Sequence, residues 1–356
     1  MATQPVLLAD PTEQWTLTKV ASFPRLRVLA WDNDVLYAAC GYTLLRARIC
    51  QGSIQWDKAG EFRPAWWRRI TSFSRLTMRL CRDGFHALAI SSTGILVGAV
   101  PQAIVTLAPG DMEFCVSHRV LRGTRPLHIA VTPRGGIFWG EYFDNPQRHE
   151  VHIYASSDGG AHWDVAYSFP AGTIRHVHNI VYDQWEDCLW VLTGDEGMEC
   201  RILRVSLDFK SIDVVLAGKQ QVRSAALITA PDAIYFSSDT PLETNHIYRL
   251  NRHGNLSEVA DLSSSSICGC RVGETMFFST MVEPSAINSG KCVCLYGSRN
   301  GEWERLLQWK KDAWPMNLFQ YGNAFLPDGN NTSGYLALTT VAVENADFET
   351  SLWRIA

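Results

Sequence analysis

The sequence reads Ser156-Ser157-Asp158-Gly159-Gly160-Ala161-His162-Trp163 directly after a strand-like run, Val151-His152-Ile153-Tyr154-Ala155. Asp158 can accept hydrogen bonds from the backbone of a turn, as Asx residues do. Gly159 and Gly160 supply the positive φ angles that a tight hairpin requires. Trp163 begins the returning strand, where its ring can cover the turn. The stretch therefore predicts a β-hairpin.

Strand-like segments recur along the chain at a spacing of 45 to 49 residues. The third strands of four successive units begin at Ile153, Ile202, Ile247 and Leu295. A four-stranded repeat of roughly 40 to 50 residues is typical of a propeller blade. No segment shows a sustained apolar period of 3.6 residues, which would indicate a helix. Degenerate copies of the hairpin turn occur at the same phase, at Ser206-Leu207-Asp208 and Ser298-Arg299-Asn300-Gly301.

The repeat predicts one all-β domain over 1–356, a β-propeller of seven four-stranded blades. Residues 63–77, with Trp66 and Trp67, do not fit the period and are expected to form an inserted loop; six blades is the alternative, because the register is weakest there. The run 14–20 should pair as the fourth strand of the last blade, which removes a free sheet edge. The blades are expected at 27–62, 78–121, 126–170, 175–218, 222–262 and 266–312, with three strands in 318–356.

Composition excludes several classes of function. The net charge is −4, so the chain has no basic footprint for nucleic acid. No stretch approaches 18 uninterrupted apolar residues, which argues against a membrane span. The first residues lack the basic and apolar regions of a signal peptide, so we expect a cytoplasmic protein. The ten cysteines, Cys50 among them, are then expected to be reduced thiols rather than disulfides or zinc ligands.

Propeller topology assigns the polar loops to faces. The loops that enter the inner strands and the loops that follow the second strands should open onto one face, with the hairpin turns on the other. Four acids follow apolar second strands at equivalent positions: Glu141, Asp195, Asp239 and Glu283. Glycoside cleavage uses paired carboxylates, one as acid and one as base or nucleophile. We therefore expect catalytic acid/base chemistry among these residues, with His178 shuttling protons.

Arginines and amides in the same loops are candidate substrate-binding groups. Arg175 and Arg223 precede successive inner strands, and a guanidinium fork suits a carboxylate or phosphate group. Their alternative role is to bridge blades through backbone carbonyls. His176 and Asn245 are expected to contact the same substrate.

A histidine pair suggests a second kind of site. His176 and His178 are two residues apart, so on a strand both point to one side. With His128 from the preceding blade and a carboxylate such as Glu141 or Asp195, they could hold a divalent metal ion. They could instead transfer protons near neutral pH. The third alternative is that they are structural histidines bonded to backbone carbonyls.

Residues 151–163 and the blade period resemble the sialidase-like superfamily of Asp-box (BNR repeat) propellers, which contains glycoside-active enzymes and also non-enzymes. Sialidases proper hold a substrate carboxylate with three arginines and use a Tyr–Glu pair as nucleophile. Only Phe23-Pro24-Arg25-Leu26 is loosely similar to their N-terminal arginine motif, with the order changed. The histidine cluster looks somewhat like that of propeller lyases for uronic-acid oligosaccharides, where histidines hold a metal ion.

Three functions follow from these patterns. The first is a carbohydrate-active enzyme of the glycoside hydrolase or sialidase-like type, acting on a small or anionic saccharide in the central pocket. The second is a metal-dependent lyase or isomerase for a uronate-like substrate, using His128, His176 and His178. The third is a non-catalytic scaffold, because propellers also bind partners and a fold does not imply a function.

Overall fold

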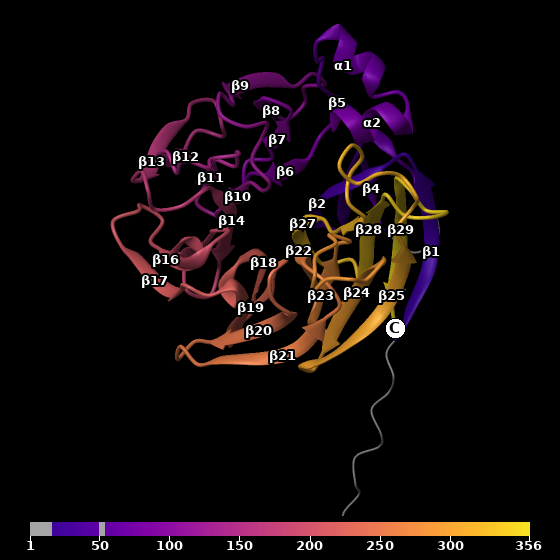
Figure 1. Ribbon diagram of the computed structural model, residues 1–356. Helices are drawn as coiled ribbons and strands as arrows, with labels where there is room; N and C mark the ends of the chain where they lie inside the picture. The colour runs from indigo at the N-terminus through magenta and orange to yellow at the C-terminus, as the bar shows by residue number, and fades with distance from the viewer. Residues whose placement is uncertain (1–15, 50–53) are drawn as a thin grey trace, which may run out of the picture.

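Seven sheets stand around a common axis in the computed structural model (Figure 1). The structure describes residues 16–49 and 54–356. The first residues of the chain, including Gln14 and Trp15 of the predicted first strand, and also Cys50, lie outside the described residues. The predicted seven-bladed, all-β propeller is confirmed.

The first three blades follow one another along the chain. The first blade comprises β2 (Arg27–Asn33), β3 (Val35–Cys40), β4 (Thr43–Arg48) and β5 (Asp57–Glu61). The second comprises β6 (Ala87–Ile90), β7 (Leu96–Val100), β8 (Ala103–Leu107) and β9 (Cys115–Arg119). The third comprises β10 (Ala130–Val131), β11 (Ile137–Gly140), β12 (Val151–Ser156) and β13 (Asp164–Phe169).

The next three blades repeat this pattern. The fourth comprises β14 (Val177–Asp183), β15 (Cys188–Thr193), β16 (Arg201–Val205) and β17 (Ile212–Ala217). The fifth comprises β18 (Ser224–Thr229), β19 (Ala233–Ser238), β20 (Asn245–Asn251) and β21 (Leu256–Leu262). The sixth comprises β22 (Ser266–Val272), β23 (Thr275–Thr280), β24 (Cys292–Arg299) and β25 (Glu302–Lys310). Short 3-10 turns at Gly197–Glu199 and Gln220–Val222 connect strands of the fourth and fifth blades.

The seventh blade joins the two ends of the chain. It comprises β26 (Asn323–Phe325), β28 (Tyr335–Val341) and β29 (Glu349–Ile355), and β1 (Leu17–Pro24) is its outer strand. Leu17 pairs with Ile355 and Pro24 with Glu349, so the pairing extends over the whole of β1. This closure confirms the predicted role of the N-terminal run, because β1 covers the outer edge of β29.

An additional strand binds the last blade to the first. β27 (Asp328–Asn331) pairs in parallel with β2, which makes the first sheet five-stranded. Gly329 has a φ of 89°, and a Cβ there would lie 2.2 Å from the backbone oxygen of Trp31. Only glycine permits so close an approach. The sequence predicts three strands in 318–356, and β27 is a fourth.

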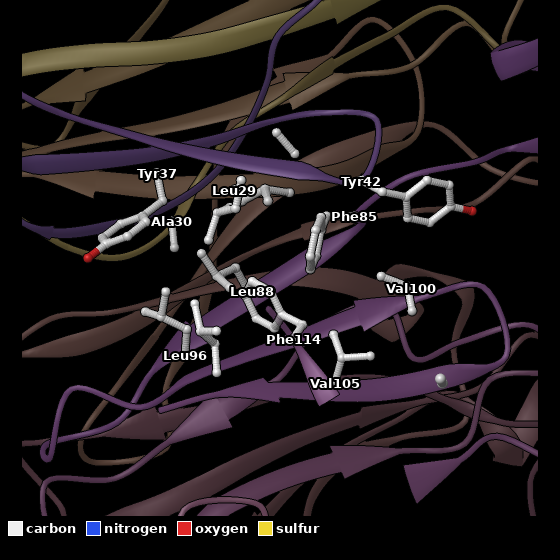
Figure 2. Close-up of a cluster of buried hydrophobic side chains, with 14 residues drawn as sticks. Leu29, Ala30, Tyr37, Tyr42, Phe85, Leu88, Leu96, Val100, Val105 and Phe114 are labelled. Atoms are coloured by element: carbon white, nitrogen blue, oxygen red, sulfur yellow. The ribbon is translucent and has the colours of Figure 1, made fainter. Parts of the chain in front are cut away.

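The core lies between neighbouring blades. Each blade is covered on both faces, so its second strand is largely buried and has an apolar centre. β15 and β23 are buried at every residue. Figure 2 shows one cluster, in which Leu29 and Tyr37 of the first blade meet Phe85, Leu88 and Val105 of the second. These buried second strands correspond to the regularly spaced strand-like segments in the sequence.

The hairpin between β12 and β13 forms as predicted. Asp158 Oδ1 accepts hydrogen bonds at 3.0 Å from two backbone N–H groups of the turn. Gly159 and Gly160 have φ angles of 76° and 87°. A Cβ on Gly160 would lie 2.9 Å from Thr106 Cγ2 and 3.3 Å from the ring of Trp163. The turn therefore packs under its own tryptophan and against the preceding blade.

The inserted segment after the first blade is helical, not a loop. It forms α1 (Trp66–Thr71) and α2 (Arg75–Cys81), which lie at the outer edge of the ring beside β4 and β5 (Figure 1). Ser74 caps α2 by accepting a hydrogen bond from the Thr77 N–H at 3.1 Å. The two helices are too short to show an apolar period in the sequence. Within residues 16–49 and 54–356, no helix has the length and apolar character needed to cross a membrane.

Candidate functional site

One face of the ring carries the loops that enter the inner strands and the loops that follow the second strands; we call it the top face. The strand order places residues 62–86, 120–129, 170–176 and 194–200 there. The turns between first and second strands lie at the opposite end. A cavity of about 1100 Å³ extends along the axis and is lined by the inner strands β2, β6, β10, β14, β18 and β22.

Asp195 is the centre of a buried polar cluster on the top face. Its carboxylate oxygens lie 3.3 Å from Arg175 Nη1 and 3.3 Å from Arg223 Nη2. They lie 3.6 Å from His176 Nε2 and 3.3 Å from His178 Nε2. Burial disfavours the charged carboxylate, but the interactions with His176 and His178 outweigh it and hold the pKa of Asp195 well below its usual range. Asp195 is therefore a fixed negative charge that unites the fourth and fifth blades.

The two histidines are oriented by backbone carbonyls. His176 Nδ1 lies 3.1 Å from the Phe143 carbonyl oxygen, and His178 Nδ1 lies 2.9 Å from the Ser224 carbonyl oxygen. A carbonyl only accepts, so each Nδ1 carries a proton and donates it. The two Nε2 atoms then face each other at 2.9 Å. Burial and the neighbouring His176 lower the pKa of His178, against the opposing hydrogen bond to Asp195.

This arrangement has two chemical uses. The two Nε2 atoms and the Asp195 carboxylate all lie within 4.8 Å of one another, which fits a divalent cation. They equally fit one proton shared between the two imidazole rings, with Asp195 balancing its charge. The guanidinium groups of Arg175 and Arg223 repel a divalent cation more strongly than they oppose a single shared proton, which carries half the charge. The electrostatics therefore favour the proton.

Asp239 and Glu283 belong to the same electrostatic neighbourhood. Arg223 Nη2 lies 3.9 Å from Asp239 Oδ2. Burial raises the pKa of Asp239 to about 7; Arg223 opposes this rise, and the charges of Glu283 and Asp195 reinforce it. Burial, together with the charges of Asp195 and Asp239, also raises the pKa of Tyr142 to about 12. The Tyr142 ring packs against His176 at a centroid distance of 4.3 Å.

Two predicted site residues are engaged outside this cluster. Glu141 binds Arg122, with Nε 2.9 Å from Oε1, and accepts the His152 N–H at 2.8 Å. Asn245 braces its own loop, because its amide accepts the Thr240 N–H at 2.9 Å and donates to the Thr240 carbonyl at 2.8 Å.

The predicted three-histidine metal site does not form. His128 faces the axial cavity, where its Nδ1 lies 3.1 Å from Asp328 Oδ2 of β27. In the described part of the chain it joins no metal-sized group with His176 and His178. The error arose because β27, which supplies the partner of His128, was not predicted. Catalytic roles for Asp195, Asp239, Glu283 and His178 stay predictions.

A second polar group lies on the top face; Arg125 was expected there from the sequence, whereas Arg27, Arg82 and His86 were not. Arg27 is the first residue of β2, and its Nη1 lies 3.3 Å from His86 Nδ1. Arg125 and Arg82 are close enough for their charges to act on His86. Arg175 and Arg223 were found because they lie within two residues of the start of an inner strand, and Arg27, the first residue of β2, meets the same rule.

The comparisons show the fold and not a family. No protein-family model matches the chain, and no curated protein matches it. A chain of the mitotic checkpoint complex superposes with a TM-score of 0.57 at 10% identity, covering 99% of both chains. The WD40 β-propeller domain of Doa1 gives 0.55 at 10% identity, covering 95% of this chain and 96% of that one. A chain of the nidogen/laminin complex gives 0.50 at 11% identity, covering 83% and 97%.

These similarities correct one expectation. A small-molecule or oligosaccharide partner in the central pocket was predicted, and this prediction is wrong: the similar propellers come from structures that include two protein complexes, the mitotic checkpoint complex and nidogen/laminin. The top-face arginines that were to hold a saccharide, Arg175 and Arg223, are instead bound to Asp195. The chain shares with its structural neighbours the architecture of a WD40-like seven-bladed propeller.

Proposed function

We propose that this protein is a non-catalytic propeller that binds a protein partner on its top face. The proposal rests on the hairpin of α1 and α2, which presents large apolar side chains to solvent. Trp66 is 76% exposed, Phe73 67% and Ile70 59%. None of the residues of α1 is buried, so these side chains do not contribute to the core of the propeller. An exposed group of aromatic and aliphatic side chains is typical of a protein-interaction surface.

The positive charge of the α1–α2 hairpin indicates that the partner segment is acidic. From Arg63 to Arg82 there are six arginines and no acidic residue, in a chain whose net charge is −4. Arg79 is buried and paired with Asp312, so it anchors α2 to the ring. Arg69 and Arg82 make no ion pair with any described residue. A partner segment that carries apolar side chains next to acidic ones complements this surface.

Two further observations support binding over catalysis. Asp195, the most central of the predicted catalytic acids, is surrounded by four cationic or hydrogen-bonding partners within the chain itself. Mitotic checkpoint and nidogen/laminin chains, which have the same architecture, are parts of protein assemblies. Those assemblies are known for the neighbouring proteins. For this chain, a protein partner is our proposal.

We also propose that the hairpin at 156–163 is an Asp-box of the sialidase-like kind, used here as a structural turn. Its support is local: the hydrogen bonds accepted by Asp158, the positive φ angles of Gly159 and Gly160, and the packing of Trp163 over the turn. This turn lies at the end of the ring opposite the proposed binding face.

Selection from a random-peptide display library tests the function. Peptides selected on the wild-type protein should bind at least about tenfold more weakly to Ile70→Ser/Phe73→Ser, because aromatic anchors contribute about 2 kcal/mol or more to such interfaces. Val214→Ser, a change of a similarly exposed apolar residue on β17, is the matched control and should leave binding unchanged. Selected peptides that bind the hairpin variant as tightly as wild type would refute the proposal.

A further inference from the structure

Three arginines that pair with no acid among the described residues lie near one another on the top face, beside the helical hairpin. Arg27 begins β2, Arg82 ends α2, and Arg125 lies in the loop before β10. His86 connects two of them: its Nδ1 lies 3.3 Å from Arg27 Nη1, and its Nε2 lies 2.7 Å from the Arg82 carbonyl oxygen. Because the carbonyl only accepts, His86 donates from Nε2 and accepts the Arg27 N–H at Nδ1. The ring is therefore neutral and holds Arg27 in place.

Within residues 16–49 and 54–356, the remaining contacts of these arginines are not ionic. Arg27 lies over the Phe325 ring, 4.0 Å from its centroid, and its Nε is buried without a hydrogen-bond partner among the described residues. Arg125 donates one hydrogen bond to the Thr124 hydroxyl at 3.2 Å. Asp83, the acid next to Arg82 in the chain, is already bound by Tyr42 and Arg68, each at 2.9 Å.

This lack of acidic partners is unusual within the protein. Most other half-buried or buried arginines pair with a carboxylate: Arg68, Arg79, Arg122, Arg148, Arg175, Arg223, Arg249, Arg252 and Arg271. Arg201, also half-buried, instead donates to two backbone carbonyls. Arg27 and Arg125 have neither arrangement within the described residues. A cation removed from water without a counter-ion is unfavourable, so the free protein carries an electrostatic cost at this position.

The pKa values are consistent with that cost. Burial, followed by the charges of Arg27 and Arg82, lowers the pKa of Arg125 to about 9. Burial likewise lowers the pKa of Arg27 to about 10. Burial first, and then the charges of Arg125 and Arg27, hold the pKa of His86 well below its usual range. An anion placed among these groups would oppose each of these shifts.

We infer that Arg27, Arg82 and Arg125 form a receptor for the carboxylates of an acidic segment in a protein partner, an assignment that rests on the proposed function and names the chemistry of the partner. Guanidinium groups bind carboxylates through two parallel hydrogen bonds, and they do so most strongly where water is excluded. Arg82 belongs both to this receptor and to the end of α2. One partner segment can therefore place its apolar side chains on the hairpin and its acids among the three arginines.

Binding of a hexaglutamate peptide with blocked ends, measured by isothermal titration calorimetry at low ionic strength, tests the receptor. The protein is itself acidic, so general attraction to hexaglutamate is not expected. A hexaglutamine peptide with the same blocked ends has the same length and no charge, and it is the comparison peptide. Hexaglutamate should bind, hexaglutamine should not, and added salt should weaken the binding. Arg125→Gln and Arg82→Gln should each raise the Kd for hexaglutamate at least about fivefold, whereas Arg305→Gln, an exposed arginine on β25, should not.

A thermal melt of the unliganded variants separates a receptor from a structural role. Arg125→Gln should raise the Tm by about 2 °C, because it removes a half-buried charge that pairs with no acid among the described residues. An arginine that merely supports the fold would lower the Tm when replaced. Equal affinity for hexaglutamate and hexaglutamine, an unchanged Kd in Arg125→Gln, or a lower Tm in that variant would each overturn the inference. Binding of a phosphoserine hexapeptide in the absence of hexaglutamate binding would overturn the assignment to carboxylates.

The two proposals fail in different ways. Hexaglutamate has no apolar side chain to place on the hairpin, so its binding should be the same in Ile70→Ser/Phe73→Ser as in wild type. If display peptides ignore the hairpin while hexaglutamate still depends on Arg125, the proposed function fails and the receptor stands. If display peptides depend on the hairpin but hexaglutamate does not bind, the receptor fails and the proposed function stands.

Discussion

His176 Nε2 lies 2.9 Å from His178 Nε2, and both imidazole rings donate their Nδ1 protons to backbone carbonyls. Two unprotonated Nε2 atoms at this distance would repel, and either a shared proton or a bound cation would relieve the repulsion. Asp195 balances either charge. The two guanidinium groups 3.3 Å from its carboxylate oxygens oppose a divalent cation more strongly than a proton.

Chelation should therefore leave the protein unchanged. We expect the Tm of the purified protein to be the same with and without EDTA, because Arg175 and Arg223 oppose a divalent cation at this position. Differential scanning calorimetry measures the Tm, and elemental analysis measures bound metal. A stoichiometric transition metal, together with a lower Tm in EDTA, would show that the histidine pair is a metal site.

Removing the central charge should destabilise the ring strongly. Asp195→Asn leaves Arg175 and Arg223 without their shared carboxylate, and breaking a buried ion pair in this way costs about 3 to 5 kcal/mol. Urea unfolding followed by circular dichroism measures the change. Asp144→Asn removes the other, exposed partner of Arg175 and should cost at most about 1 kcal/mol. Equal losses in the two variants would count against a structural role for Asp195.

The stability of the protein should depend on the protonation of Asp239. Its pKa is raised to about 7 by burial in the folded state, against an ordinary value of 3.8. The folded protein therefore holds this proton over a pH range in which the unfolded chain has lost it. This contribution to stability is fully present below pH 3.8 and is lost as the pH rises through 7.

Asp239→Asn isolates this effect. The free energy of unfolding of the variant, relative to wild type, should increase between about pH 4 and pH 7 by an amount on the order of 4 kcal/mol and then level off. Urea unfolding across this pH range measures it. A difference between the two proteins that does not change with pH would mean that Asp239 keeps an ordinary pKa in the fold.

The packing of the hairpin turn against the preceding blade can be measured with two glycines. Gly160→Ala should lower the free energy of unfolding by about 1 to 3 kcal/mol more than Gly110→Ala does. Both glycines have positive φ, at 87° and 93°, so the backbone strain is matched. A Cβ at Gly160 would lie 2.9 Å from Thr106, whereas one at Gly110 would meet nothing within 4 Å. Equal losses would mean that strain alone accounts for the effect.

The fold was predictable because propeller blades repeat a recognisable pattern of strand-like segments in the sequence. Buried strands such as β15 and β23 have apolar centres, at Leu189–Leu192 and Met276–Phe278, and the Asp158 turn marks a hairpin. The helices α1 and α2 show no recognisable pattern in the sequence. Neither exceeds seven residues, and α1 packs no residue into the interior, so no apolar period exists to be found.

The site was predictable where topology alone determines it. Asp195, His178 and Arg223 were expected to meet because their loops open onto one face, and they do. Contacts that depend on side-chain direction were not predictable. Glu141 follows its strand as Asp195 does, yet it turns to Arg122. His128 faces an acid on β27, a strand that pairs with a distant part of the chain.

Hydrogen–deuterium exchange of the complex with a display-selected peptide tests the central claim most directly. The account predicts protection of residues 66–82 and of the backbone around Arg27 and Arg125 when the peptide is added. Protection confined to the opposite end of the ring, at residues 91–94, 133–135 and 184–187, would contradict it and would place the partner on the other face.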